Sequence, residues 1–184
     1  MILFVNACAR SESRTKRLAA AFLAGRDEAV TELCLNSVKF PVVDEEFLRR
    51  RDSLILARDF ANPEFSLARQ FAEADEIVIA APYWDLSFPA VLKQYIEQIN
   101  VIGVTFRYTP EGIPEGLCRA KKLTYIMTAG GTFAPEEYGF GYIKALAHNY
   151  YGISDVNLIK AVGLDIDGAD AEQILKDAEA SIIR

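Results

Sequence analysis

The chain has 184 residues, of which 51% are hydrophobic and 25% charged, and its net charge at pH 7 is −6. This length suits one α/β domain over residues 1–184, and the composition excludes wholesale disorder. The acidic balance, without a basic stripe, argues against a nucleic-acid partner. No apolar run is long enough to span a membrane or to form a signal-peptide core, so we expect no membrane association.

The three cysteines, Cys8, Cys34 and Cys118, are odd in number, far apart and without a Cys-x-x-Cys pair. This usage is typical of reduced thiols in the cytoplasm, and it favours neither a disulfide framework nor a zinc site. With His148 as the single histidine of the sequence, we expect no bound metal.

Short β-type runs alternate with stretches of helical periodicity along the chain. Strands are predicted over Ile2–Asn6, Val30–Leu35, Glu76–Ala81, Leu123–Thr128 and Val156–Val162. Helices are predicted from Ser13 onward and over Glu45–Phe60, Phe65–Glu73, Pro89–Ile99, Glu136–Tyr150 and Ala171–Ile183. The alternation predicts an α/β fold, a doubly wound parallel sheet of five strands with helices on both faces.

Ligands of such sheets bind at the carboxyl ends of the strands. The loops 7–15, 82–88 and 129–135 each follow a predicted strand, so we expect them to meet in space. The first loop places Ser13, Arg14 and Thr15 at the start of a helix. Because a helix N-terminus offers free N–H groups and partial positive charge, this loop favours a phosphate monoester.

The other two loops suit a flat heterocycle. Tyr83 and Trp84, in the segment APYWDLSFP, offer an aromatic wall. Gly130 and Gly131 follow another strand; glycines allow close approach of a ligand, although a tight turn requires them equally. The segment 103–109, GVTFRYT, predicts either a short strand pair or a lid.

The first loop also supports a second interpretation. Cys8 and Arg14 have the Cys-x5-Arg spacing of tyrosine phosphatases of the low-molecular-weight type, in which a thiolate attacks phosphorus. Against this, the loop has no glycine, Glu12 would oppose a dianion, and no Asp-Pro pair follows late in the chain. A phosphatase remains an alternative, as does a non-enzymatic electron carrier of the flavodoxin type.

The segments GVTFRYT, APYWDL and TAGG resemble the FMN-dependent NADH-azoreductases, which belong to the NAD(P)H–quinone oxidoreductase-like proteins of flavodoxin-like fold. The likeness runs from about residue 1 to residue 184 and is strongest over 80–131. It implies the strand order 2-1-3-4-5, bound FMN, NADH or NADPH as donor, a quinone or azo acceptor, and a homodimer. It also implies two-electron ping-pong transfer in which the flavin, and no side chain, carries the hydride.

The resemblance assigns roles to particular residues. FMN binding falls to Cys8, Ser13, Arg14, Thr15, Tyr83, Trp84, Asp85, Leu86, Thr128, Ala129, Gly130 and Gly131. The first four are expected at the phosphate, the next four beside the isoalloxazine and the last four at its pyrimidine edge. The substrate side is assigned to Tyr108, Phe133 and Tyr150, of which Tyr150 is expected to reach the partner subunit's flavin.

Four of these positions depart from the family pattern. Cys8 replaces a serine, Asp85 an asparagine, Ala129 an arginine and Phe133 a histidine. A carboxylate near the flavin would disfavour an anionic reduced form. The departures therefore bear on azo-dye activity and donor preference more than on flavin binding itself.

Overall fold

The computed structural model describes residues 1–182 and contains a five-stranded sheet in the order β2-β1-β3-β6-β7. The strands are β1 (Ile2–Asn6), β2 (Val30–Cys34), β3 (Glu76–Ala80), β6 (Lys122–Thr128) and β7 (Asp155–Ala161). Every neighbouring pair is parallel. Since β4 and β5 form a separate pair, β6 and β7 are the fourth and fifth strands of the sheet. The predicted order 2-1-3-4-5 is therefore confirmed.

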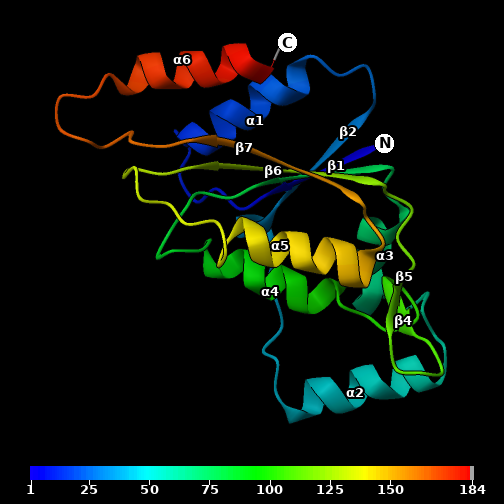
Figure 1. Cartoon of the computed structure of the whole chain (residues 1–184). Helices are drawn as coiled ribbons and strands as arrows, with labels where there is room; N and C mark the ends of the chain where they lie inside the picture. Colours follow the sequence, from blue (N-terminus) through cyan, green and yellow to red (C-terminus); the bar gives the residue numbers. More distant parts are fainter. Residues whose placement is uncertain (183–184) are drawn as a thin grey trace.

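Helices cover both faces of the sheet. The helices of the chain are α1 (Arg14–Ala24), α2 (Glu45–Leu56), α3 (Ser66–Glu73), α4 (Ala90–Ile99), α5 (Phe140–Leu146) and α6 (Ala171–Ile182), with the 3-10 turns η1 (Leu35–Ser37) and η2 (Pro63–Phe65) and a π-helical turn η3 (Ala147–Tyr151) after α5. Figure 1 shows α1 and α6 on one face and α3, α4 and α5 on the other. The end predicted for the last helix, at Ile183, lies outside the described residues.

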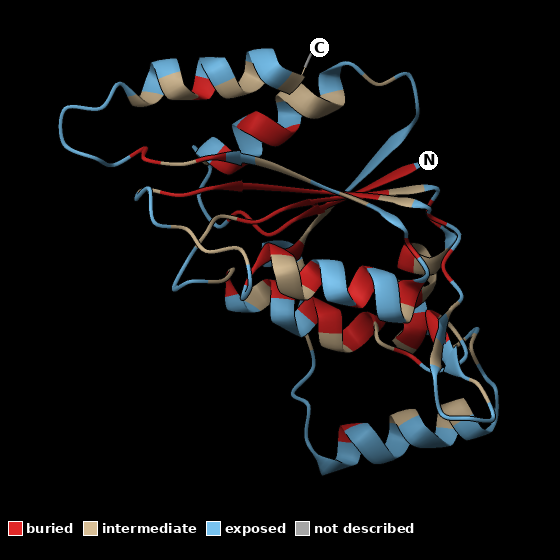
Figure 2. Ribbon diagram, viewed as in Figure 1, coloured by how far each residue is buried: buried red, intermediate tan, exposed pale blue. Residues whose placement is uncertain are grey.

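The alternation of side chains along each strand builds the two hydrophobic layers. In β1, Ile2 and Phe4 belong to the cluster beneath α1 and α6, whereas Leu3 and Val5 belong to the cluster beneath the other helices. All residues of β1 are buried, as expected for a parallel strand covered on both faces. Figure 2 shows the buried residues concentrated in the central strands, while α2 is exposed along most of its length.

Two predicted helices are wrong at one boundary. The helix predicted over Glu45–Phe60 ends at Leu56, because Arg58 takes a left-handed φ of 54°. The helix predicted over Glu136–Tyr150 begins only at Phe140. Before it, the carbonyl of Glu136 accepts hydrogen bonds from Gly139 and Gly141 at 3.3 and 2.7 Å, which closes a turn instead of a helix.

The segment between α4 and β6 forms an antiparallel pair, β4 (Phe106–Tyr108) and β5 (Pro114–Gly116), so the strand-pair alternative is confirmed. α4 begins beyond the carboxyl end of β3 and runs back over 10 residues, roughly 15 Å. The β4–β5 pair consequently lies at the amino end of the sheet, opposite the loops 7–15, 82–88 and 129–135 (Figure 1).

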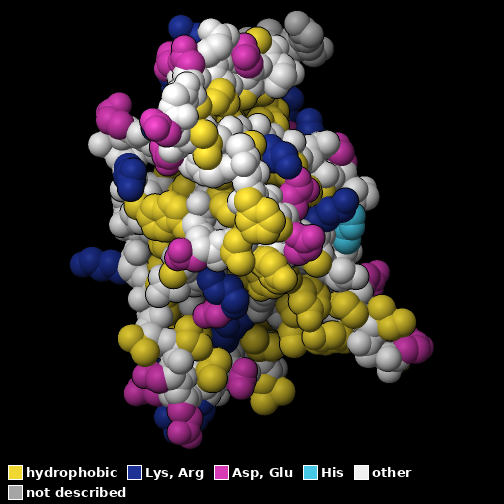
Figure 3. All heavy atoms as spheres, turned by 60° about the vertical axis from the view of Figure 1, so that its left-hand side comes forward, with side chains coloured by type: hydrophobic (Ala, Val, Ile, Leu, Met, Phe, Trp, Pro, Cys, Tyr) yellow, Lys and Arg dark blue, Asp and Glu magenta, His cyan; other side chains and the backbone are white. Residues whose placement is uncertain are grey.

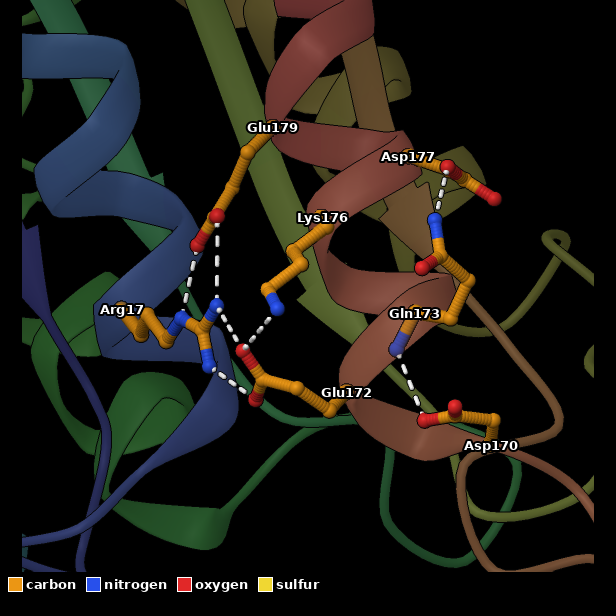
Figure 4. Close-up of polar contacts among 7 residues, drawn as sticks. All are labelled: Arg17, Asp170, Glu172, Gln173, Lys176, Asp177 and Glu179. Carbon is orange, nitrogen blue, oxygen red and sulfur yellow. Dashed lines mark hydrogen bonds and ion pairs between the residues drawn. The ribbon is translucent and has the colours of Figure 1, made fainter.

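Ion pairs join α6 to α1, as Figure 4 shows. Arg17 contacts the Glu172 carboxylate through Nη1 and Nη2 at 2.6 and 2.9 Å, and its Nε contacts Glu179 at 2.7 Å. Asp170 caps α6 by accepting a hydrogen bond from the Gln173 amide at 3.0 Å. Among the described helices, none is both long and apolar enough to cross a bilayer.

Candidate functional site

The first turn of α1 provides donors for an anion. Ser13 is the N-cap, and its Oγ accepts a hydrogen bond from the Lys16 amide at 3.2 Å. The Arg17 amide donates to the Ser13 carbonyl at 3.0 Å. Within residues 1–182 the amides of Arg14 and Thr15 have no hydrogen-bond acceptor, so they remain free at the positive end of the helix.

A pair of buried hydroxyls joins this turn to the end of β6. The oxygens of Thr15 and Thr128 lie 2.6 Å apart, and either can be the donor. Both residues are buried, with exposed fractions of 1% and 8%. Two hydroxyls carry two protons and use one between themselves, so the pair keeps one proton that it can donate to a ligand.

Arg14 crosses from α1 to the loop that follows β7. Its Nη1 donates to Asp165 Oδ1 at 2.6 Å and to the Leu164 carbonyl at 3.3 Å. Asp165 was not among the predicted site residues. The signal that could have identified it is topological, because the strand predicted over Val156–Val162 also ends at this edge of the sheet.

The aromatic side of the site is a tight turn after β3. Trp84 and Ser87 exchange backbone hydrogen bonds of 3.2 and 2.7 Å, and the residues between them, Asp85 and Leu86, have φ values of 51° and 66°. Positive φ at both central positions is the mark of a type I′ turn. Such backbone is uncommon without glycine, and it persists at functional positions where the surroundings enforce it.

Two contacts fasten that turn to the loop before α5. The Ser87 hydroxyl donates to the Tyr138 carbonyl at 2.7 Å, and the Tyr83 hydroxyl donates to the Pro135 carbonyl at 3.2 Å. Burial raises the pKa of Tyr83, so its phenol stays protonated at neutral pH. The turn carrying Trp84 is therefore held by the neighbouring strand-end loop as well as by its own backbone.

The two glycines after β6 serve different purposes. A Cβ on Gly130 would overlap the carboxylate of Asp165, whereas a Cβ on Gly131 would meet nothing closer than the Phe133 amide at 4.0 Å. Gly130 is thus a glycine because a side chain of the next loop lies against it. Close approach of a ligand is therefore not the only reason for a glycine at position 130, because Asp165 also leaves no room for a side chain there.

These loops enclose a cavity of about 320 Å³, a size within the usual range for small-molecule sites. Eight of the predicted FMN-binding residues line it, namely Ser13, Arg14, Thr15, Tyr83, Trp84, Thr128, Ala129 and Gly130. The other lining residues, which were not predicted to bind FMN, are Ala9, Arg10, Glu12, Pro82, Leu164 and Asp165. Asp85 and Gly131 directly follow lining residues, and Leu86 follows Asp85, but none of the three lines the cavity.

Cys8 lies behind the cavity wall. Its side chain is buried, and its Sγ lies 3.8 Å from the Ala80 carbonyl oxygen. Burial raises the pKa of the thiol above its usual value, although a hydrogen bond with Ser13 lowers it in part. A phosphatase requires the opposite, a thiolate at neutral pH in contact with the phosphate. The geometry therefore favours phosphate binding over phosphate hydrolysis.

The three residues expected at the substrate do not line the cavity of the same chain. Phe133 is 80% exposed on the loop after β6, at the carboxyl end of the sheet. Tyr108 and Tyr150 flank Phe106 at the amino end, with ring-centroid distances of 5.5 and 4.6 Å to it. A hydrogen bond with Tyr150 is the main cause of the raised pKa of Tyr108.

The donor set fits FMN. Free helix amides, a hydroxyl pair and Arg14 line the cavity, as a phosphate monoester requires, and so do Tyr83 and Trp84, as a flat ring requires. Within the described residues, no group of three or more His, Cys, Asp or Glu side chains is placed to hold a metal ion.

Comparisons with known proteins agree with this geometry. A family model described as having a flavodoxin-like fold matches residues 1–184. An FMN-dependent NADH:quinone oxidoreductase of Clostridium beijerinckii is 34% identical over 96% of this chain and 93% of that protein. A protein of the same name from Coprothermobacter proteolyticus is 35% identical over the same shares. The solved structure of an azoreductase from Bacillus anthracis superposes with a TM-score of 0.84 at 28% identity, over 98% of this chain and 95% of that one.

Proposed function

The chain belongs to the family of flavodoxin-like fold, and on that basis we propose that it is an FMN-dependent NADH:quinone oxidoreductase that also accepts azo compounds and related planar molecules. The observation that carries the proposal is the cavity at the carboxyl end of the sheet, where phosphate donors and an aromatic wall meet. The relatives that match nearly the full length of the chain carry the same activity in their names.

Each part of the cavity has a task in this function. Ser13, Arg14 and Thr15 hold the phosphate, together with the free amides of α1. Tyr83 and Trp84 flank the ring system, while Thr128, Ala129 and Gly130 lie at its polar edge. Bound FMN supplies reversible hydride acceptance from a nicotinamide, and the chain supplies binding, orientation and exclusion of water.

With residues 1–184 acting as one domain, donor and acceptor share one cavity and bind in turn. We therefore expect ping-pong kinetics, seen as parallel double-reciprocal lines when quinone is varied at several fixed NADH concentrations. Trp84, which lines the cavity, is 40% exposed, so the side of the cavity that it forms is open to solvent. Intersecting lines would contradict a shared site.

We propose further that the enzyme is a cytoplasmic homodimer. Tyr108 and Tyr150 lie at the amino end of the sheet, so within this arrangement they can reach a flavin only in a second copy. Figure 3 turns the carboxyl end of the sheet forward and shows a broad apolar area. Trp84, Phe133 and Tyr138, on the loops that follow β3 and β6, are exposed large side chains. Exposed apolar patches of this kind mark interfaces. The three free cysteines support a reducing compartment.

The deciding experiment is an absorption spectrum of the purified protein with added FMN. We expect a flavin spectrum that stays with the protein through gel filtration and that NADH bleaches in the absence of oxygen. Return of the colour on adding a quinone would complete the cycle. A protein that ignores FMN and hydrolyses p-nitrophenyl phosphate would instead establish the phosphatase alternative.

A further inference from the structure

Asp165 occupies an unexpected place for a carboxylate, since it lines a cavity that suits a phosphate. It is paired there with Arg14 through Nη1 alone. Within residues 1–182, Nε and Nη2 of Arg14 make no hydrogen bond, although Arg14 also lines the cavity. One nitrogen of the guanidinium is therefore anchored, and the remaining donors stay available to a ligand.

The backbone fixes the position of Asp165. Three amides of its loop donate to the loop after β6: Gly163 to Gly131 at 3.0 Å, Leu164 to Ala129 at 3.2 Å and Asp165 to Gly130 at 2.9 Å. Beyond the loop, α6 packs on α1, the helix that carries Arg14, because buried Leu175 belongs to the same apolar cluster as Leu18. The ion pairs of Arg17 also join the two helices (Figure 4). Both ends of the loop are thus attached to elements of the site.

The pair is too exposed to matter much for stability. The side chains of Arg14 and Asp165 are 43% and 67% exposed, and ion pairs at such positions contribute little to folding. A different reason for the pair is geometric. Arginine loses rotamer freedom when it binds a phosphate, and a partner that already holds the guanidinium reduces that loss.

We propose that Asp165 is a positioning residue for the FMN phosphate, which holds Arg14 in the orientation that binds it. The inference rests on the proposed function, because it needs FMN in this cavity. Alone, the Asp165 carboxylate repels a phosphate dianion; beside Arg14, its charge is compensated and its effect on binding changes sign. That change of sign distinguishes a positioning role from simple repulsion.

The test is a double-mutant cycle on the full chain, with FMN and riboflavin titrated against flavin-free protein. The variants are Asp165→Ala, Asp165→Asn, Arg14→Met and the double variant Arg14→Met with Asp165→Ala. We expect Asp165→Ala to weaken FMN binding about tenfold, as for one displaced hydrogen bond to a charged group. Its affinity for riboflavin should stay within about twofold of the parent's. Asp165→Asn should stay within about threefold for both flavins, because its amide oxygen still accepts from Nη1.

The decisive comparison is the Arg14→Met background. In that background, Asp165→Ala should tighten FMN binding, because it removes a carboxylate whose charge Arg14 no longer compensates. If Asp165→Ala tightens FMN in the parent as well, the carboxylate only repels and the inference is overturned. Equal weakening of FMN and riboflavin would also overturn it, by making Asp165 structural. Failure of the parent to bind FMN would instead refute the proposed function.

Discussion

At the carboxyl end of the sheet, the loops after β1, β3, β6 and β7 meet around one cavity and are fastened to each other by hydrogen bonds. At the amino end, the short β4–β5 pair presents Tyr108 with 47% of its surface exposed, beside Tyr150. The cavity at the first end is lined by backbone and side-chain groups of one chain. The second offers side chains that one chain alone does not bring to the cavity.

The comparison indicates that the two parts of the proposed site depend on different parts of the fold. A phosphate requires positive charge and N–H donors at fixed positions, and a helix N-terminus fastened to a sheet supplies both. An acceptor that binds and leaves requires an open, apolar surface. We therefore expect changes at the carboxyl end to alter FMN affinity, and changes at the amino end to alter turnover.

The largest effect is expected from removing the phosphate donors. Replacing Ser13 and Thr15 by alanine removes two hydroxyls, each worth about 1.5–3 kcal/mol when it donates to a charged group. FMN affinity should fall by roughly two to four decades if the terms add. Riboflavin, which lacks the phosphate, should lose little in the same titration. Equal losses of affinity for both flavins would show that Ser13 and Thr15 do not bind the phosphate.

A smaller effect separates the two glycines after β6. In Gly130→Ala the new methyl would displace the Asp165 carboxylate and disturb Arg14, so we expect about a tenfold loss of FMN affinity. Gly131→Ala is the matched control, because its methyl meets nothing closer than 4.0 Å. Fluorescence titration of both variants measures the difference. Identical behaviour would mean that Arg14 does not need Asp165 in place.

The amino end provides a test of the dimer. Tyr108→Ala should leave FMN affinity within about twofold but lower kcat/KM for a quinone about fivefold, in proportion to one lost aromatic contact. Light scattering should give the mass of two chains for both the parent and the variant. A fully active monomer at micromolar concentration would show that Tyr108 and Tyr150 do not contact the substrate.

The smallest effect is expected at Cys8. Cys8→Ser should change FMN affinity by less than about threefold, because the side chain lies behind the cavity wall. Since burial raises the pKa of the thiol, the thiolate fraction at pH 7 is below that of an ordinary cysteine. Alkylation of native Cys8 by iodoacetamide should therefore be slow at pH 7 and keep rising above pH 9. Fast modification at neutral pH would revive the phosphatase alternative.

Much of the phosphate end follows from the sequence alone. Local periodicity located all five sheet strands to within a residue or two of their ends, and strand alternation brought the loops 7–15, 82–88 and 129–135 to one edge. Ser13 caps α1 as its residue type predicts, and Thr15, the second residue of α1, lines the cavity. Short-range chemistry decides these features, so a single sequence carries them.

Two kinds of feature required the tertiary structure. Arg14 and Asp165 are 151 residues apart and meet only because the crossovers bring α1 beside the end of β7. The purpose of Gly130 and the distance of Tyr108 and Tyr150 from the cavity likewise depend on what other segments place nearby. Periodicity reports which side of an element is buried, but it does not report which distant segment does the burying. That choice is made by the packing of whole elements against one another.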